Sequence, residues 1–526
     1  MLEDARRRDA TRPLECDVCI VGGGPAGIAV ALELAAAGRS VCLLEAGGLA
    51  HERRSQALLA GESAGSRYPP LVETRCARLG GATGVWAGWC RPLDAIDFEA
   101  RGWVAGSGWP FLREEILPHL ARAHALCGLG PPEYEAADWE SRARMARLPL
   151  GEEFEPAIFH MRPQKFGDAH RAALERDPRI RVLLHAVALR LERGGDGGLV
   201  ARLRAGTLEG RRFEVLARRY VLAAGGIENA RLLLLSGDSP ERAIGNARGL
   251  VGRYFMEHGF INAGSFVPRD PAPSLAFHLP FAHPEGARGT VRALVALGAK
   301  TQREARLLNG ALFFHPAYEA HAAFDSEEVR AMLEIGNALR GRAVPGAFGR
   351  RAATALRAPG KLATAVLRKL AARRLQPARW RTRAIFECAP DRGNRVTLSG
   401  RKDAFGRPLA RLEWRLGEGD VASAMEMHRR FDAALRRSGL GHFESRLPTE
   451  PAAWREAVEW GKHHLGTTRM SRDPAQGVAD PDGRVHDVPN LYVAGSSVFP
   501  AGGYANPTLT LVALAVRLGR HLASEP

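Results

Sequence analysis

The chain has 526 residues, of which 45% are hydrophobic and 25% are charged, and its net charge is +16. This length favours two large domains, and this composition is typical of globular proteins and excludes a disordered or fibrous chain. No stretch approaches the roughly eighteen consecutive apolar residues of a transmembrane helix. Seven cysteines are too few for a disulfide scaffold.

The excess of positive charge is concentrated in one segment. From Arg340 to Arg383 the sequence has 13 basic residues and no acidic one, so the rest of the chain has a net charge of 16 − 13 = +3. Nucleic-acid binding is not expected, because no base-reading motif accompanies the charge. Residues 361–376 have the pattern of an amphipathic helix. The segment is interpreted as a solvated surface, or as a binding surface for an anionic membrane or an acidic protein partner.

The first residues, MLEDARRRDATRPLE, are charged and lack the apolar run of a secretory signal. A cytoplasmic protein is therefore expected, with peripheral membrane association left open. The next elements predict a βαβ unit. Asp17–Val21 and Ser40–Leu44 are short apolar runs typical of buried parallel strands, and Ile28–Ala37 is apolar at helical spacing. Cys16 and Cys19 point to opposite faces of the first strand, so no metal site is predicted.

The turn between the first strand and the helix carries a glycine fingerprint, Gly22-x-Gly24-x-x-Gly27. In such a turn the glycines allow a tight bend, close approach of a pyrophosphate, and close packing of helix on strand. The free N–H groups at the start of the helix favour an anion. Glu45 follows the second strand, where an acid can accept hydrogen bonds from ribose hydroxyls. The unit therefore predicts a site for FAD or NAD, and Glu45 disfavours NADP.

Further pieces of parallel sheet occur in the middle and at the end of the chain. Tyr220–Ala224 predicts a buried strand followed by a helix over Ile227–Leu235, and Leu491–Ala494 predicts another strand. Thr508–Leu522 predicts the last helix. Residues 260–450 have looser, alternating patterns. The sequence therefore predicts an α/β protein, with a Rossmann-like domain built from discontinuous segments and a second domain inserted into it.

Five segments, in this order, resemble sequence blocks of the glucose–methanol–choline (GMC) flavoprotein oxidoreductases. They are DVCIVGGGPAGIAVALELAAAGRSVCLLEAGG, RLGGATGVWAGWCRPLDAIDFEARGW, LAAGGIENARLLL, VGRYFMEHG, and the stretch from HHLGTTRM to YANPTLTLVALA. Bacterial sugar and polyol dehydrogenases and the flavin oxidases of aminoglycoside biosynthesis look nearest. The resemblance implies FAD rather than NAD, and oxidation of an alcohol by hydride transfer to flavin N5.

The resemblance also implies a division of the chain. We expect an FAD-binding domain made of residues 14–155, 179–259 and 455–526. An excursion at 156–178 belongs with an α+β substrate-binding domain at 260–454, whose sheet lies over the flavin. Specificity is expected to reside in this second domain.

His463 matches the active-site histidine of the family's His-x-x-Gly-Thr pattern, and Asn506 matches its second active-site position. A neutral imidazole is a base with a pKa near working pH, so His463 is the expected base for the alcohol proton. Asn506 is expected to hold the alcohol oxygen by a hydrogen bond. His464 is a rival for the base, although adjacent residues usually face different directions.

The remaining flavin contacts come from the same resemblance. They are Gly80, Gly81, Thr83, Ala188, Gly495, Ser496 and Thr508. Relatives that attach FAD covalently carry a histidine where this chain has Val85, so non-covalent FAD is expected. Glu257 and His258 either line the pocket or tie the two domains together.

We expect the substrate to be a hydroxyl of a sugar, glycoside, aminoglycoside or polyol. The electron acceptor, whether oxygen, a quinone or a redox protein, stays open. Two alternatives remain: a non-redox lyase on the same fold, and a dehydrogenase subunit docked to a membrane or partner that passes electrons to a quinone or cytochrome.

Overall fold

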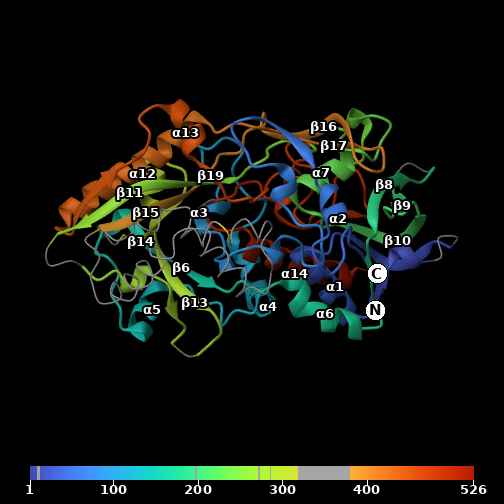
Figure 1. Ribbon diagram of the computed structural model, residues 1–526, viewed down its shortest axis with the longest axis horizontal. Helices are drawn as coiled ribbons and strands as arrows, with labels where there is room; N and C mark the ends of the chain where they lie inside the picture. The colour runs from blue at the N-terminus through green and yellow to red at the C-terminus, as the bar shows by residue number, and fades with distance from the viewer. Residues whose placement is uncertain are drawn as a thin grey trace.

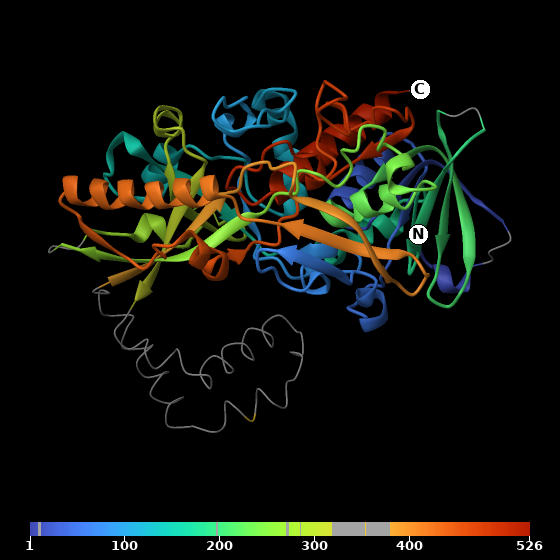
Figure 2. The ribbon, with the colours of Figure 1, turned by 90° about the horizontal axis from the view of Figure 1, so that it is seen from above.

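The computed structural model describes residues 1–8, 12–195, 198–269, 273–284, 286–317, 353 and 379–525. The molecule is elongated, and its two large sheets lie toward opposite ends of the long axis (Figures 1 and 2). Both ends of the chain lie at the end that holds β8, β9 and β10. The helix expected at 361–376 and most of the basic segment at 340–383 lie outside the described residues. None of the described helices is long and apolar enough to cross a bilayer.

The predicted βαβ unit is confirmed. β2 (Leu14–Val21) and β3 (Val41–Leu44) pair in parallel, and α1 (Pro25–Ala36) connects them. The helix begins earlier than its apolar pattern suggests, because Pro25 occupies the first helical position, where a missing N–H and a fixed φ cost nothing. The apolar strands are buried because helices cover their sheet.

This sheet has eight strands. Its path is β1 (Leu2–Asp4), β7 (Ile180–Leu184), β3, β2, β10 (Arg212–Leu222), β9 (Val200–Gly206) and β8 (Val187–Arg193), and β20 (Leu491–Val493) also pairs with β10. The strands β1, β7, β3, β2, β10 and β20 are parallel, whereas β8 and β9 form an antiparallel extension. β10 starts earlier than predicted, because its alternating first residues, 212–215, pair with β9 in that extension.

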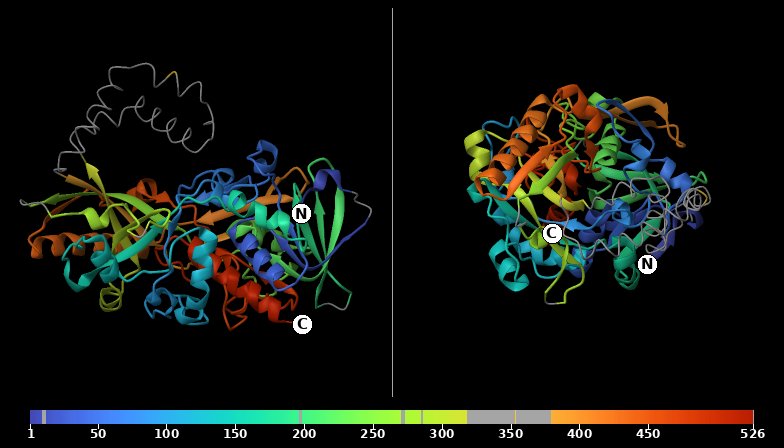
Figure 3. Two further views of the ribbon diagram at one scale, coloured as in Figure 1. Left: turned by 90° about the horizontal axis from the view of Figure 1, so that it is seen from below. Right: turned by 60° about the vertical axis from the view of Figure 1, so that its left-hand side comes forward.

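The last helix closes the same unit. α14 (Thr508–Ser524) lies beside α1 and α4 (Leu117–Cys127) (Figure 3). Gly519 allows the close approach, because a Cβ there would lie 2.8 Å from the Cβ of Glu33 on α1. The two ends of the sequence thus build one layer of the first sheet.

The second sheet has nine strands and is antiparallel. Its path is β18 (Gly441–Ser445), β11 (His258–Pro268), β15 (Arg379–Glu387), β14 (Gly310–Ala317), β13 (Thr290–Leu297), β6 (Phe154–Met161) and β5 (Trp89–Cys90), with β12 (Phe281–Ala282) on β13 and β19 (Glu459–Trp460) on β11. The long helix α12 (Glu418–Arg437) packs along it (Figure 2). β6 reaches this sheet from within the N-terminal third of the chain.

Two strands of the inserted region belong to neither large sheet. β16 (Arg395–Lys402) and β17 (Pro408–Trp414) form a hairpin, and β17 pairs in parallel with β4 (Gly61–Gly65). This three-stranded sheet packs beside α7 (Gly225–Leu234). It therefore connects the inserted region to the N-terminal segment.

Candidate active site

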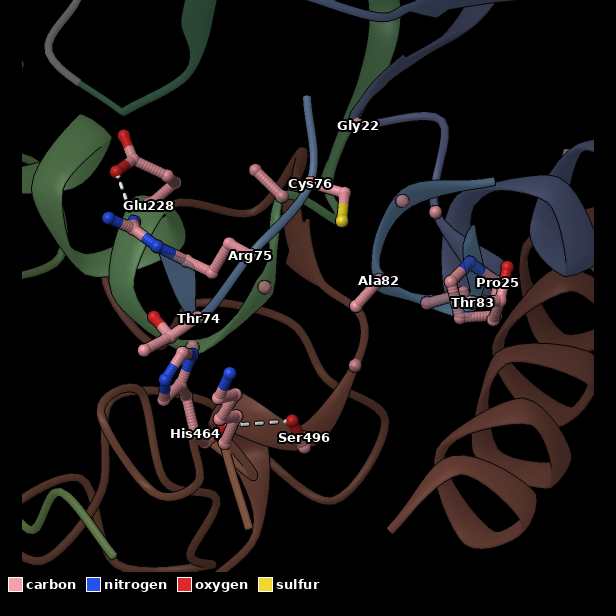
Figure 4. Close-up of a pocket in the computed structure, with 18 of the residues that line it drawn as sticks. Gly22, Pro25, Thr74, Arg75, Cys76, Ala82, Thr83, Glu228, His464 and Ser496 are labelled. Atoms are coloured by element: carbon pink, nitrogen blue, oxygen red, sulfur yellow. Dashed lines mark hydrogen bonds and ion pairs between the residues drawn. The ribbon is translucent and has the colours of Figure 1, made fainter. Parts of the chain in front are cut away.

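A cavity of about 620 Å³ lies between the two large sheets. On one side it is lined from the carboxyl ends of β2, β3 and β10 and from the loop after β20, and on the other from β11, β14 and β15. The carboxyl ends of parallel strands meet at one edge of a sheet, which is where ligands bind in open α/β folds. Figure 4 shows residues of both the glycine turn and the C-terminal segment facing this space.

All but two of the residues predicted from the sequence line this cavity. They are Gly22, Gly24, Glu45, Gly81, Thr83, Ala188, His463, His464, Gly495, Ser496, Asn506 and Thr508. Gly27 and Gly80 do not line it. A Cβ at Gly27 would lie 2.0 Å from the carbonyl oxygen of Gly22, and the Gly80 N–H donates to the Gly23 carbonyl at 2.7 Å. These two glycines shape the lining turns without facing the cavity.

The glycine turn leaves room for a large anion. Gly22 has φ +110°, and a Cβ there would lie 2.6 Å from the Ala223 carbonyl oxygen, whereas nothing lies within 4 Å of a Cβ placed on Gly24. The first turn of α1, whose N–H groups have no intrahelical acceptor, begins beside that open space. The residues present therefore fit the pyrophosphate of a dinucleotide.

Glu45 lies at the same end of the cavity. Its carboxylate accepts hydrogen bonds from the N–H groups of Gly23 and Gly47, both at 2.9 Å, and burial raises its pKa. The two N–H groups fix the carboxylate and leave lone pairs for ribose hydroxyls. Further along the wall, Arg75 and Glu228 form an ion pair at 2.5 Å (Figure 4).

His463 and Asn506 meet at the other end of the cavity. The Nε2 atom of His463 and the Nδ2 atom of Asn506 are 3.2 Å apart, although 43 residues separate them in the sequence. Burial, with His258 and His464 nearby, lowers the pKa of His463 well below its usual value. His463 is therefore a neutral imidazole. The Oδ1 atom of Asn506 is buried, and no partner for it is found among the described residues.

His464 faces a different direction from His463. Its Nε2 atom lies 3.0 Å from the hydroxyl of Tyr68, and its carbonyl accepts a hydrogen bond from Ser496 Oγ at 2.8 Å (Figure 4). Burial lowers the pKa of His464 to about 3. The side chain is thus held at the cavity wall by Tyr68, away from Asn506.

Glu257 and His258 do not line the cavity; they lie behind His463. The Glu257 carboxylate accepts hydrogen bonds from the backbone N–H groups of His463 at 2.7 Å and of His258 at 2.9 Å. His258 Nδ1 is 2.9 Å from His463 Nδ1. Of the two alternatives left by the sequence, pocket lining is therefore wrong. The pair instead connects the start of β11 to the histidine loop.

The opposite wall was not recognised from the sequence. It is formed by Trp89, Phe260, Phe313, His315 and Arg383. Arg383 pairs with Glu459 at 2.5 Å and lies over the ring of Phe260. These residues belong to strands whose alternating pattern gives no functional signal, so only the fold reveals that they share a surface.

Comparison with known families identifies two segments. Residues 390–515 match the family described as GMC oxidoreductase, and residues 17–270 match the FAD dependent oxidoreductase family. These segments contain the histidine loop and the glycine turn described above. The chain belongs to the GMC oxidoreductase family. Like other members of this family, it is an FAD-dependent oxidoreductase.

Two relatives match nearly the whole chain. The 2-methyl-1,2-propanediol dehydrogenase of Mycolicibacterium austroafricanum is 27% identical, covering 97% of this chain and 95% of the relative. The 6'''-hydroxyparomomycin C oxidase of Streptomyces lividus is 26% identical, and the match covers 97% of this chain and 91% of the relative. The C-glycoside 3-oxidase of Arthrobacter globiformis is 36% identical over 26% of each chain.

Solved structures share the fold. A formate oxidase of Aspergillus oryzae superposes with a TM-score of 0.57 at 19% identity, covering 98% of this chain and 99% of that one. The pyridoxine 4-oxidase of Mesorbium loti superposes with a TM-score of 0.56 at 18% identity, and the match covers 96% of this chain and 99% of that one. The expected α/β fold with a discontinuous FAD-binding domain is thus confirmed.

Proposed function

We propose that the protein oxidises an alcohol hydroxyl of a sugar, glycoside, aminoglycoside or polyol. The proposal rests chiefly on the pairing of His463 Nε2 with Asn506 Nδ2, 3.2 Å apart, in the cavity that holds the FAD-binding residues. Relatives aligned over nearly all of the chain are a diol dehydrogenase and an aminoglycoside oxidase. When bound, FAD supplies the acceptor for the hydride that leaves the alcohol carbon.

His463 is the proposed base. Its low pKa keeps the imidazole neutral at physiological pH, so a nitrogen lone pair is available for the alcohol proton. Asn506 is the proposed positioning group, because its amide can donate to the alcohol oxygen while that hydroxyl donates to His463. The substrate hydroxyl then replaces the contact between His463 and Asn506. His464 is a weaker candidate for the base, since Tyr68 already occupies its Nε2 atom.

The wall opposite the FAD-binding turns supports a polyhydroxylated substrate. Phe260 and Phe313 offer apolar faces to the C–H groups of such a molecule, and Arg383 offers N–H donors to its hydroxyls. The Arg383 side chain is 29% exposed, so part of its guanidinium is accessible to a ligand.

We also propose that FAD is held without a covalent bond. Val85 lines the cavity with 77% of its surface exposed, and its side chain carries no nucleophile. Precipitating the purified yellow protein with acid tests this. The flavin colour should stay in the supernatant, and a yellow pellet would contradict the proposal.

The reaction is tested by anaerobic reduction of the bound flavin. We would add 2-methyl-1,2-propanediol, paromamine, a C-glycoside and common hexoses separately, and follow the absorbance of oxidised FAD. Bleaching by one class supports alcohol oxidation and identifies the substrate type. Bleaching by none of them, with FAD bound, would count against the proposal.

Admitting air after reduction distinguishes an oxidase from a dehydrogenase. Rapid recovery of the oxidised spectrum indicates oxygen as the acceptor, whereas recovery only with a quinone or redox dye indicates a dehydrogenase. A lyase would leave the flavin oxidised with every alcohol. The relatives reported above are oxidases and dehydrogenases, which favours the redox reaction.

A further inference from the structure

Three polar contacts run in series from the cavity into the protein. Asn506 Nδ2 lies 3.2 Å from His463 Nε2, and His463 Nδ1 lies 2.9 Å from His258 Nδ1. On its far side, His258 Nε2 lies 3.3 Å from the carbonyl oxygen of Gly502. His258 is fully buried, whereas His463 is partly exposed to the cavity. The series therefore connects a buried backbone group to a nitrogen at the cavity wall.

Each contact in this series needs one proton. The Asn506 amide presents either its nitrogen or its oxygen, depending on its orientation, whereas the backbone carbonyl at the other end has one fixed role. A backbone carbonyl oxygen accepts hydrogen bonds and never donates them. His258 Nε2 must therefore carry a proton to bond with Gly502. Burial lowers the pKa of His258 to about 4, so its ring is neutral and holds a single proton. Its Nδ1 atom is left as an acceptor, and the proton between the two rings must come from His463 Nδ1.

We propose that His258 is a positioning residue that, by bonding to the Gly502 carbonyl, holds the ring proton of His463 on Nδ1 and keeps Nε2 as a free base. The nitrogen that faces Asn506 and the cavity is then the one with the lone pair. This inference rests on the proposed function for its catalytic meaning, although the position of the proton does not depend on it.

The opposite arrangement of protons is unfavourable at two places. With the proton of His463 on Nε2, His258 would have to donate from Nδ1, and its bare Nε2 would face the Gly502 carbonyl oxygen. Two lone pairs would then meet at 3.3 Å in a buried site. In addition, a protonated Nε2 of His463 would face the Nδ2 atom of Asn506, which is also a donor, unless that amide turned over. A protonated Nε2 could not accept a proton from the substrate.

The backbone around the two rings is fixed by one carboxylate. Glu257 accepts the N–H groups of both His258 and His463 through its Oε1 atom, at 2.9 and 2.7 Å. Tyr68 donates to its other oxygen at 2.6 Å. The spacing of the rings is therefore set by a shared anchor and does not depend on the ring contact alone.

The carbonyl at the end of the series is anchored too. The N–H of Gly503 donates to Glu387 Oε1 at 3.3 Å, and Glu387 forms a fully buried pair with Arg101 at 2.6 Å. A Cβ on Gly502 would lie 2.7 Å from Leu465 Cδ1 and 3.4 Å from His258 Nε2, so the turn packs closely against the ring. The Gly502 carbonyl oxygen is thus held within hydrogen-bonding distance of His258 Nε2.

The first test observes the proton directly and needs no substrate. The FAD-bound protein would be labelled with ¹⁵N at histidine, and the ring nitrogens observed by long-range ¹H–¹⁵N correlation near pH 7.5. Among the 17 histidines, His463 is assigned by the signals missing from a His463→Ala variant. We expect a protonated Nδ1 and an unprotonated Nε2 for His463. A protonated Nε2 would overturn the proposal.

The second test compares two variants of similar shape. His258→Asn keeps an acceptor close to the Nδ1 position, whereas His258→Leu removes it. We expect the leucine variant to lose about 10- to 100-fold in the rate of anaerobic flavin reduction, the usual cost of removing a partner that orients a functional histidine. The half-saturating substrate concentration should change little, and the asparagine variant should recover most of the rate. Equal losses in both variants would contradict the proposal.

The two tests separate this inference from the proposed function. If no alcohol reduces the flavin of the wild-type protein, the proposed function fails while the NMR spectrum still reports the proton. If an alcohol reduces the flavin but Nε2 of His463 carries the proton, the proposed function is supported and the proposed role of His258 is wrong. If the leucine variant does not fold, the NMR spectrum of the wild-type protein still shows which nitrogen of His463 carries the proton.

Discussion

Tyr68 donates a hydrogen bond of 2.6 Å to Glu257, a fully buried carboxylate for which no cationic side-chain partner is found among the described residues. Backbone N–H groups and one phenol hydroxyl thus replace the usual salt bridge. Burial raises the pKa of Glu257 to about 7 in spite of these donors. The anchor of the histidine loop therefore changes its charge close to physiological pH.

Replacing Glu257 with glutamine should change how stability depends on pH. In the folded protein the carboxyl titrates near 7, and its ordinary value is 4.5. Between these values the native state binds the extra proton, so the stability of the wild type falls as pH rises and levels off above about 7. At about 1.4 kcal/mol per pKa unit, this contribution is about 3 kcal/mol.

The measurement is the thermal unfolding midpoint of both proteins at several pH values from 5 to 8, with FAD bound. The midpoint of the wild type should fall relative to that of Glu257→Gln as pH increases across this range. Parallel curves would show that Glu257 does not titrate there.

Removing the proposed base should stop flavin reduction without removing the flavin. His463→Ala is expected to lower the rate of anaerobic reduction by about 10²- to 10⁴-fold, the usual contribution of a general base. His464→Ala is the matched control, because that ring bonds to Tyr68 on the cavity wall. The larger loss should occur at His463; a reversed order would make His464 the base.

The rate of flavin reduction should fall only at low pH. His463 must be neutral to accept a proton, and burial keeps its pKa well below the ordinary 6.5. The rate of flavin reduction should therefore stay constant from pH 8 down to pH 6.5 and decline only at lower pH. Stopped-flow reduction in overlapping buffers measures this, and a half-loss near pH 6.5 to 7 would refute the assignment.

Asn506 should affect both binding and rate. Asn506→Ala removes the donor to the alcohol oxygen, which costs about 3- to 10-fold in the ratio of reduction rate to half-saturation. Asn506→His keeps a hydrogen-bonding group at this position and should retain more activity. Equal activity of the alanine variant and the wild type would exclude a positioning role.

The FAD end of the site could be predicted because its signals are local. Gly22, Gly24 and Gly27 form one short motif between a strand and a helix, and Glu45 follows the next strand. The pairing of His463 with Asn506 came from the family resemblance and the spacing of its motifs. The structure places these residues around one cavity.

The support behind His463 could not be predicted in the same way. His258 and His463 are 205 residues apart, and no periodic pattern links the start of a strand to a distant loop. The pairing of β17 with β4 is also invisible in sequence, because an alternating strand does not specify its partner. Such contacts depend on the complete fold.

The close packing of α14 on α1 and the pairing of β20 with β10 have a consequence for synthesis of the protein. The glycine turn leaves the ribosome first, but the strand and helix that complete its sheet come from the last forty residues or so. Contacts this distant in sequence form slowly, and domains that contain them expose apolar surface until they close. The nascent chain should therefore remain unable to retain FAD until β20 and α14 have been synthesised, and chaperones should bind its N-terminal half in the meantime.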